Sequence, residues 1–422
     1  MGHLSNVRTF RAFRSLNYSL YFAGRSVSQF GTWMQRTAVV WVVYSITHSA
    51  FMLGLTIFAE QFPSFLLSVF GGIAADRYNR YKIIKITQIL SMIQASLLAL
   101  LIIIGHYVLW QILVLSVLLG IINAFDVPAR QSMIHEVLND PNDLPNALSL
   151  NSAMASVARL LGPAASGIIL ENFGAGICFL LNAASFGGVI LSLVFMKLPA
   201  VAIAPTKKKV WSDLLEGFVY LKKASSIGYL IVILAMVNLM VVPYDTLLPV
   251  YAKVIFKGSA ATYGYITSFI GLGAVSGTVL LASLNENADL KKLLLICTVI
   301  LGGGLLAFSY LRSFPLAMLF AVITGLGTVA QNTITNIIIQ SESTPSMRGR
   351  VISIMIMAMF GLLPIGSLMI GAISQKIGAP ATVFGQGLSC LIIAAIFFRF
   401  LRTGKLTQQT EGEYPIKTRK GH

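Results

Sequence analysis

Twelve apolar runs follow one another along this chain, and they leave little room for any fold other than a membrane-embedded bundle of helices. About 20 apolar residues are enough for a helix to cross the hydrocarbon core of a bilayer. The sequence therefore predicts an all-α polytopic membrane protein with twelve transmembrane helices. The predicted spans are approximately Tyr18–Ile46, Phe51–Ala75, Ile83–Ile104, Val108–Val137, Leu144–Leu170, Gly176–Met196, Gly228–Tyr251, Thr262–Leu284, Leu290–Tyr310, Phe314–Gln340, Val351–Gln375 and Ala381–Phe400.

The composition supports the same class, because only 11% of the 422 residues are charged and the mean hydropathy is +0.79. Soluble domains carry about 25% charged residues. A net charge of +16 is also compatible with nucleic-acid binding. The basic residues, however, lie in alternate connections between the spans, as in membrane proteins, so nucleic acid is not expected as a partner.

The distribution of lysine and arginine predicts the orientation, since these residues stay on the cytoplasmic side of short connections. The odd-numbered connections are poor in base, apart from Lys253, Lys257, Arg312 and Lys376. We therefore expect a multi-pass protein of the inner (plasma) membrane with both termini in the cytoplasm. The basic residues on the cytoplasmic side are Arg8, Arg11, Arg14, Arg77, Arg80, Lys82, Lys85, Lys197, Lys207, Lys208, Lys209, Lys222, Lys223, Lys291, Lys292, Arg348 and Arg350.

The three cysteines, Cys178, Cys297 and Cys390, lie far apart inside apolar runs. That placement favours small core residues over a disulfide framework or a metal site, and no metal is expected. Met1 to Leu16 is polar and basic, so no cleavable signal peptide is predicted.

An internal repeat divides the chain into two halves. His48–Gly54 aligns in register with Gly258–Gly264, which places Lys292 at the position of Lys82 and Glu286 at that of Asp76. Two six-helix repeats joined by a charged linker are typical of facilitator transporters. The predicted parts are a first bundle (1–198), a cytoplasmic linker with an amphipathic helix (199–227), a second bundle (228–403) and a cytoplasmic tail (404–422).

The amphipathic helix of the linker is expected from the spacing of its apolar residues, Trp211, Leu214, Leu215, Phe218 and Leu221. Such a helix can lie on the cytoplasmic face of the membrane. An ordered linker without attachment to the membrane fits the same pattern.

A short charged turn separates the second and third spans, in the run from Gly71 to Lys82. Glycines before it allow close helix packing, and Asn79 can adopt a left-handed conformation at low cost. The pattern Gly72-x-x-x-Asp76-Arg77-x-Asn79-Arg80 resembles the signature loop between helices two and three of the major facilitator superfamily. Asn79 replaces the usual second glycine. An ordinary positively charged cytoplasmic turn is the alternative interpretation.

Further motifs extend the resemblance over nearly the whole chain. They are similar to the branch of the superfamily that includes the enterobactin exporter and bacterial drug and macrolide efflux proteins. The run with Gly162, Pro163 and Gly167 resembles the fifth-helix motif of drug/proton antiporters. The resemblance implies export driven by a proton gradient, without a cofactor and as a monomer. The other motifs are Gly31–Gln35, Ala124–Gln131, Arg159–Pro163 and Arg348–Val351.

Rival classes find less support in the sequence. It contains no phosphate-binding Gly-x-x-x-x-Gly-Lys-Ser/Thr loop and no His-Glu-x-x-His or Gly-x-Ser-x-Gly pattern, so an enzyme is not predicted. Nothing suggests the repeated pore-lining rings of a channel. A flippase for a lipid or a lipid-linked precursor on the same fold remains the alternative to an exporter of small molecules.

Polar residues inside the spans are the candidates for transport, because an ionisable group at membrane depth is costly and usually functional. For any single amide, an interhelical hydrogen bond is the other explanation. Proton coupling is expected in the first half, and an apolar, aromatic-bearing substrate such as a siderophore or a drug is expected between the halves. The proton-coupling candidates are Glu60, Arg36, Asp126 and Asp245, and the candidates for the substrate cavity are Arg25, Gln29, Arg159, Asn123, Asn238, Gln331 and Asn332.

Glu60 is the first candidate for the proton site. Arg36 precedes the turn at His48 by as many residues as Glu60 follows it, so both lie about 18 Å from that turn in a helical hairpin. An arginine that approaches or leaves the carboxylate could switch its proton on and off. A permanent structural ion pair is the alternative, because equal depth does not show that the side chains face each other.

The superfamily resemblance also implies a gate. In that superfamily the loop arginine bridges the loop aspartate and an acid of helix four, and the aspartate faces the start of helix eleven. Here the corresponding network is Asp76, Arg80 and Asp126, with Gly349 and Arg350 nearby, and it would latch the outward-open state.

Overall fold

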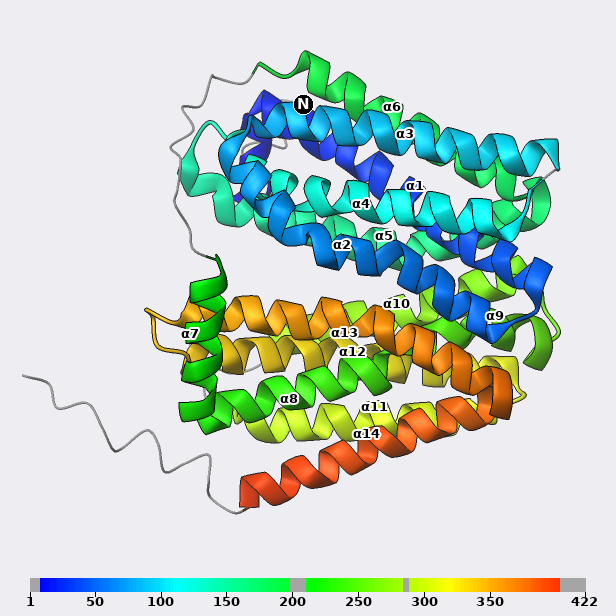
Figure 1. The fold of residues 1–422 in the computed structure, drawn as a ribbon, viewed down its shortest axis with the longest axis vertical. Helices are drawn as coiled ribbons and strands as arrows, with labels where there is room; N and C mark the ends of the chain where they lie inside the picture. Colours follow the sequence, from blue (N-terminus) through cyan, green and yellow to red (C-terminus); the bar gives the residue numbers. More distant parts are fainter. Residues whose placement is uncertain (1–7, 106, 198–209, 284–287, 403–422) are drawn as a thin grey trace, which may run out of the picture.

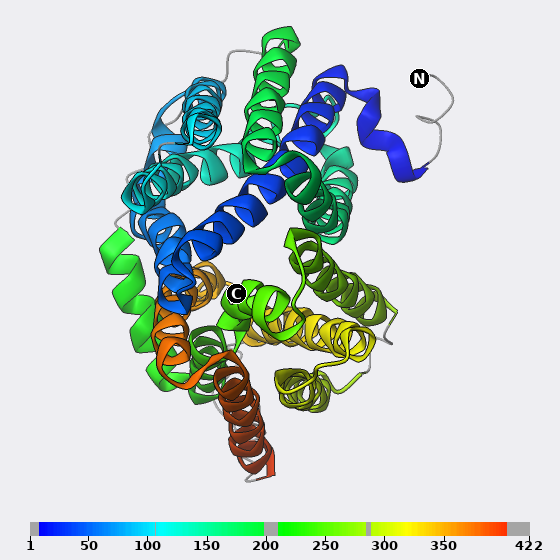
Figure 2. The ribbon, with the colours of Figure 1, turned by 90° about the vertical axis from the view of Figure 1, so that its right-hand side faces the viewer.

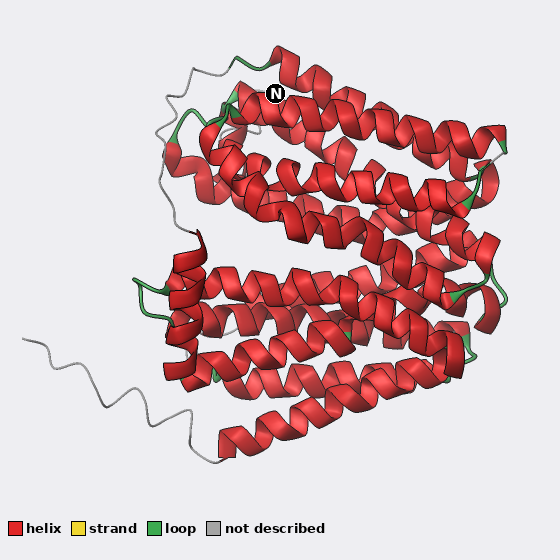
Figure 3. Cartoon of the chain, in the orientation of Figure 1, coloured by secondary structure: helices red, strands yellow, loops and turns green. Residues whose placement is uncertain are grey.

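Helices joined by short connections make up the part of the chain described by the computed structural model, residues 8–105, 107–197, 210–283 and 288–402 (Figure 3). Glu286, the first part of the predicted linker and the tail lie outside these residues. The long helices are α1 (Leu16–Thr47), α2 (Ala50–Arg77), α3 (Arg80–Ile104), α4 (Leu109–Met133), α5 (Leu144–Phe173), α6 (Ala175–Phe195), α7 (Val210–Lys223), α8 (Ser225–Met240), α10 (Ala260–Ala282), α11 (Leu290–Ser309), α12 (Phe314–Glu342), α13 (Arg348–Ile377) and α14 (Ala379–Arg402).

Eleven helical segments among the described residues are long and apolar enough to cross a membrane. The 32-residue helix α1 carries Arg25 and Arg36 and packs against α5 and α6 as the twelfth long element of the bundle. The prediction of an all-α membrane protein is confirmed. Most helix ends lie within about one turn of the predicted ones.

The seventh predicted span is not one continuous helix. After α8 the chain continues as a 3-10 turn, η4 (Val242–Leu247), a short α9 (Leu248–Val250) and a π-helical turn, η5 (Tyr251–Ile255). Pro243 and Pro249 lack the backbone N–H that a regular helix needs at those positions, which explains the break. Asp245 therefore lies in an irregular segment between two helical pieces.

The helices form two groups, α1–α6 and α8–α14, which lie one above the other in both ribbon views (Figures 1 and 2). One end of the bundle, here called the linker end, carries α7 and the α2–α3 and α12–α13 connections (Figure 1). The other, the opposite end, carries the α1–α2, α5–α6 and α13–α14 connections. The two groups come closest toward the opposite end (Figure 1).

The starts of equivalent helices follow the predicted repeat. α2 begins at Ala50 and α10 at Ala260, each after a serine at the N-cap. Asn79 and Asp289 cap α3 and α11, and their side chains accept hydrogen bonds from the backbone N–H groups of Lys82 (3.2 Å) and Lys292 (3.1 Å). The bond from the backbone of Lys292 holds the pKa of the Asp289 carboxyl below its usual value.

Asn79 is not left-handed, contrary to the sequence-based expectation. Its φ of −62° and ψ of 114° are those of an extended N-cap residue. Its short amide side chain satisfies one of the unpaired N–H groups of the first turn of α3. The residue that replaces the usual glycine thus acts as a cap rather than as a flexible turn.

The linker helix α7 packs across the start of α13. Glu216 and Arg350 form an ion pair of 2.6 Å, and Gly217 faces Ile354. Leu221 is buried, but Leu215 and Phe218 remain exposed. The predicted apolar face is therefore only partly used against the bundle; the side chains of Trp211 and Leu214 lie outside those described.

Two close helix pairs join the halves: α2 with α13 and α5 with α10. On the first pair, Gly54 lies against the backbone of Ser367 and Gly371 against that of Ala50. On the second, Gly264 lies against Pro163, and the backbone N–H of Ala164 donates to Ser268 Oγ (2.9 Å). Small residues let the backbones approach, as expected for helices in a membrane.

Inside the first half, Gly71 and Gly72 have contrasting surroundings. A Cβ atom on Gly71 would overlap the carbonyl oxygen of Ala124 in α4, whereas one on Gly72 would meet nothing within 4 Å. The close crossing of α2 and α4 thus depends on Gly71 and not on Gly72.

We expect Gly71→Ala to destabilise the protein by about 1–3 kcal/mol, because overpacking forces the two backbones apart. Gly72→Ala is the matched control and should leave stability unchanged. The thermal unfolding midpoints of both purified variants in detergent test this. Equal midpoints would show that α2 and α4 do not cross as described.

Candidate functional site

Three candidate residues that are distant in sequence meet between the two halves. Arg36 of α1 and Arg159 of α5 come from the first half, and Asp245 of η4 comes from the second. Both guanidinium groups act electrostatically on the Asp245 carboxylate. The phenol of Tyr263, on α10, lies in the field of Arg36 and Asp245. We call these four residues and Tyr244 the central cluster.

The break in the seventh span places the acid of this cluster. Pro243 ends the regular helix, and the 3-10 turn that follows carries Tyr244 and Asp245 side by side. Tyr244 is buried, and its phenol lies near the side chain of Thr328 on α12. This contact holds the turn against α12.

The arginines of the central cluster have no direct acid partner. Among the described residues, no carboxylate lies within ion-pair distance of Arg36 or Arg159. The guanidinium of Arg36 lies 5.7 Å from the ring centre of Trp33, and the Cβ of Trp33 packs against Gly162 of α5. Arg159 is partly exposed although it lies in the middle of α5.

Contacts between the halves close the site toward the opposite end. Trp41 of α1 stacks on Tyr263 of α10 with ring centres 6.2 Å apart. Ser49 Oγ donates to Gln375 Oε1 (2.9 Å), and Ser259 Oγ donates to Glu171 Oε2 (2.6 Å). The largest apolar core also contains residues from the last part of α1 and the start of α2, packed with residues of the second half.

Two predicted cavity amides lie next to the central cluster. Asn238 Nδ2 donates to Asn332 Oδ1 (3.4 Å), and Asn332 Nδ2 donates to the carbonyl of Thr328 (3.1 Å), whose side chain lies near Tyr244. Gln331 is fully buried, and its side-chain amide has no hydrogen-bond partner among the described residues.

The remaining cavity candidates are more dispersed. Arg25 donates to the Tyr21 hydroxyl (2.9 Å) toward the linker end of α1, and Gln29 and Asn123 are half-buried. Their place in a substrate site stays a prediction.

Glu60 and Arg36 do not form the ion pair considered from the sequence. In this conformation Arg36 lies over Trp33 and acts on Asp245, so the acid that faces it comes from the other half. Glu60 is half-buried on α2, and no hydrogen bond or ion pair to its side chain is present among the described residues. The equal depth predicted for Arg36 and Glu60 in the hairpin therefore does not make them partners.

Asp126 is held in a buried network inside the first half. Its carboxylate pairs with Arg130, one turn later in α4, and accepts hydrogen bonds from Thr87 Oγ1 (2.6 Å) and Gln88 Nε2 (2.9 Å) of α3. A carboxylate with three donors fixes α3 to α4. This arrangement favours a structural role for Asp126 over proton transfer.

Arg80, the arginine of the predicted gate, also has partners other than the predicted ones. Arg80 donates to the carbonyl of Ala75 (3.0 Å) and pairs with Glu136 (2.5 Å), beyond the end of α4. Asp126 lies seven residues before the end of α4 at Met133, about 10 Å deeper along the helix, which is too far for the same contact. The pairing of Arg80 with Asp126 is thus replaced in this conformation. A gating role for Gly72, Asp76, Arg77 and Arg80 stays a prediction.

The fifth-helix motif lies along the contact between α1, α5 and α10. Gly162 faces Trp33, while Gly167 faces the backbone of Ala260. Pro163 presents its carbonyl to Gly264. These small residues position Arg159, one turn earlier on α5, beside the second half.

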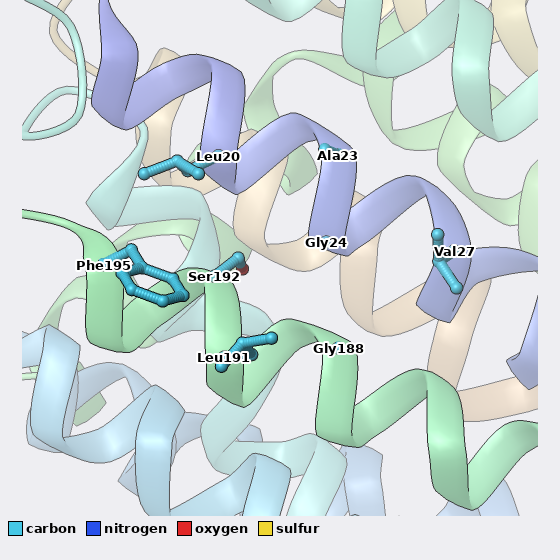
Figure 4. A pocket seen from close by; sticks show the side chains of 8 residues that line it. All are labelled: Leu20, Ala23, Gly24, Val27, Gly188, Leu191, Ser192 and Phe195. Carbon is cyan, nitrogen blue, oxygen red and sulfur yellow. The ribbon is translucent and has the colours of Figure 1, made fainter.

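A separate groove runs between α1 and α6 (Figure 4). Its lining is apolar except for the Ser192 hydroxyl, and it contains none of the candidate residues. The described residues include no group of three or more side chains suited to a metal ion.

The sequence-based reasoning missed Tyr244, Tyr263, Arg130 and Glu136. The four-residue spacing of Asp126 and Arg130 on one helix was a signal for their pairing. Glu136, Tyr244 and Tyr263 became recognisable only when the fold brought their elements together.

Comparison with known proteins gives one family over most of the chain. Residues 7–415 match the model of a family described as transmembrane secretion effector. The staphyloferrin A transporter of Staphylococcus aureus is 27% identical over 395 residues, covering 92% of this chain and 97% of that protein. The enterobactin exporter EntS of Shigella boydii is 24% identical over 412 residues (97% and 96%), and the multidrug efflux pump Tap of Mycolicibacterium fortuitum is 22% identical over 378 residues (86% and 91%).

Solved structures share the fold at low sequence identity. A mutant of the nucleoside transporter NupG superimposes with a TM-score of 0.74 at 12% identity, covering 91% of this chain and 99% of that one. A bacterial homologue of the human lysosomal transporter Spinster, in an inward-facing and unoccupied conformation, gives 0.72 at 15% identity (92% and 97%).

We expect Asp126→Asn and Arg130→Gln each to destabilise the protein by about 3–5 kcal/mol, because each leaves a buried charge without its partner. Thr87→Val removes a single hydrogen bond to Asp126 and should cost about 1 kcal/mol. The measurement is the shift of the thermal unfolding midpoint in detergent. Additive effects in the double variant Asp126→Asn/Arg130→Gln would contradict a direct pair.

Proposed function

The chain belongs to the transmembrane secretion effector family of the major facilitator superfamily, and from this premise we propose that it exports an amphipathic small molecule in exchange for protons. Relatives along nearly the full length are a siderophore transporter, a siderophore exporter and a multidrug efflux pump by name. The substrate belongs to the same broad group of siderophores and drug-like compounds, and the protein works as a monomer in the inner membrane.

The central cluster is the observation that carries this proposal. Charged and aromatic side chains from both halves converge on one place, as expected where a substrate binds at the interface between two repeats. Arg36, Arg159 and Asp245 supply charge, and Trp33 supplies aromatic surface. Tyr244 and Tyr263 are buried in the same region. The amides Asn238 and Asn332 stand beside them.

The contacts between the halves support transport by alternating access. The closing contacts at the opposite end include two side-chain hydrogen bonds, one aromatic stack, small-residue packing and a shared apolar core. Such contacts can separate while each half moves as a unit. With both termini in the cytoplasm, this conformation is closed toward the outside, and separation at the opposite end would release substrate there.

Glu60 is the proton carrier in this proposal, and no cofactor is needed. A carboxylate without a fixed partner can take up a proton without breaking an ion pair, whereas Asp126 is locked to Arg130 and Asp245 lies in the field of two arginines. Glu60 also lies on α2, one of the helices that packs across to the second half. Closure of the halves around an unpaired carboxylate costs free energy that protonation removes.

A comparison of a deletion strain with its parent tests the export function. We expect the deletion strain to retain a siderophore or drug-like compound inside the cell and to lose resistance or export. Accumulation of a phospholipid or lipid-linked intermediate, with no such change, would favour a flippase and overturn the proposal.

We expect Glu60→Gln to abolish transport driven by a pH gradient in reconstituted vesicles, down to the level of empty vesicles. Substrate exchange without a gradient should persist, because the glutamine keeps the shape of the site but carries no titratable proton. Asp140→Asn, in an exposed turn, is the matched control for loss of an acid. Full gradient-driven transport by Glu60→Gln would remove Glu60 from the mechanism.

A further inference from the structure

We propose that the groove between α1 and α6 binds one acyl chain of an anionic phospholipid, whose phosphate lies against the ammonium group of Lys197. The site goes beyond the export function, because it does not depend on what the protein exports. All of its residues belong to the first half, and none of them is part of the central cluster (Figure 4).

Two glycines shape the groove. A Cβ atom on Gly24 of α1 would overlap the hydroxyl group of Ser192 on α6, so the two helices cross closely at this point. Gly188, one turn earlier on α6, has nothing within 4 Å of the place where a Cβ atom would stand. The helices therefore touch at Gly24, and open space remains beside Gly188. The rest of the lining is Leu20, Ala23, Val27, Leu191 and Phe195.

The size and chemistry of the groove fit an acyl chain. Its volume is about 280 Å³, which is below the roughly 300–1,000 Å³ of pockets for drug-sized molecules. On α1 the lining runs from Leu20 to Val27, which is about 10 Å along the helix. The hydroxyl of Ser192 donates to the carbonyl of Val189 (2.8 Å), so its proton is not free for a ligand. A long and narrow apolar space of this kind accepts methylene groups better than a polar or bulky substrate.

The groove lies on the lipid-facing side of the first half. Val27, Leu191 and Phe195 are 57%, 58% and 61% exposed, although all three belong to helices of the bundle. Tyr18 lies on another face of α1, where its hydroxyl donates to the carbonyl of Ala147 on α5 (3.0 Å). In a bundle that crosses a membrane, the exposed apolar face of a helix is in contact with lipid tails. The ligand that reaches this groove is therefore a lipid.

A lysine stands at the linker end of the groove. Lys197 follows the last turn of α6, and its backbone N–H donates to Asn17 Oδ1 (3.1 Å) while Asn17 Nδ2 donates to its carbonyl (3.0 Å). These two bonds tie the end of α6 to the first turn of α1. They leave the side chain of Lys197 exposed, and its ammonium group has no hydrogen bond or ion pair among the described residues.

The charge of Lys197 selects the headgroup. A lysine near the membrane surface attracts anionic lipids, and its ammonium group binds phosphate as a point charge. The apolar groove leads from the membrane interior to this cation, which matches the order of acyl chain and phosphate in a phospholipid. A zwitterionic headgroup carries its own cation beside the phosphate, so an anionic headgroup gains more from Lys197.

Photo-crosslinking to the full-length protein in nanodiscs tests the proposal. The discs contain phosphatidylcholine and a minor fraction of phosphatidylglycerol with a diazirine in one acyl chain, and mass spectrometry identifies the labelled peptides. We expect labelling to concentrate on 20–27 and 188–195. Unlabelled phosphatidylglycerol should displace the probe about fivefold more effectively than phosphatidylcholine. Even labelling of all lipid-facing helices, or equal displacement by both lipids, would overturn the proposal.

A leucine at position 188 tests the groove, because the open space beside Gly188 accommodates it. We expect Gly188→Leu to lower labelling of the groove to the level of the other lipid-facing helices. Gly303→Leu on α11 is the matched control, since Gly303 is also exposed and also has nothing within 4 Å of its Cβ position. Concentrated labelling that persists in Gly188→Leu, once size-exclusion shows the variant folded, would rule out the groove.

A glutamine at position 197 tests the headgroup contact without filling the groove. Lys197→Gln should remove the preference for phosphatidylglycerol over phosphatidylcholine and leave the labelled peptides unchanged. Lys376→Gln, exposed at the opposite end, is the control for loss of one positive charge. A preference for phosphatidylglycerol that survives in Lys197→Gln would contradict the assigned phosphate contact.

Discussion

Close packing along two helix pairs, α2 with α13 and α5 with α10, is the constraint on which the rest of the structure depends. Lipid provides no hydrophobic driving force between helices, so the halves associate through backbone contact, hydrogen bonds and shape. Gly54, Gly264 and Gly371 allow that contact because a side chain at any of them would meet the backbone of the other half.

That arrangement explains why charge collects where it does. Arg159 is one turn from the small residues of the α5–α10 contact, so it is held beside the second half without being covered by it. Asp245 reaches the same place because two prolines interrupt its span. In contrast, Asp126 and Arg130 satisfy each other within one half, and their network fixes α3 to α4. Ionisable groups at membrane depth therefore have two different uses in one chain.

Much of the fold was predictable from local patterns. The length of the apolar runs specified the helices. The register of the repeat correctly made the start of α11 equivalent to the start of α3. The candidate residues Arg36, Arg159 and Asp245 were identified individually by their cost in a membrane. Their grouping was not predictable, because hairpin depth suggested Glu60 as the neighbour of Arg36, and depth carries no information about which way a side chain faces.

The sequence by itself determined the class of fold, the number of long helices, the internal repeat and the short inventory of polar residues inside the spans. These properties depend on hydropathy and spacing, which act over one or two turns of a helix. Only the tertiary structure decided the partners: Glu136 for Arg80 and Arg130 for Asp126. It also placed Asp245 in the field of the two arginines. Partnership depends on the rotation of each helix about its axis and on the break in the seventh span, and both are set by packing between elements that are distant in the chain.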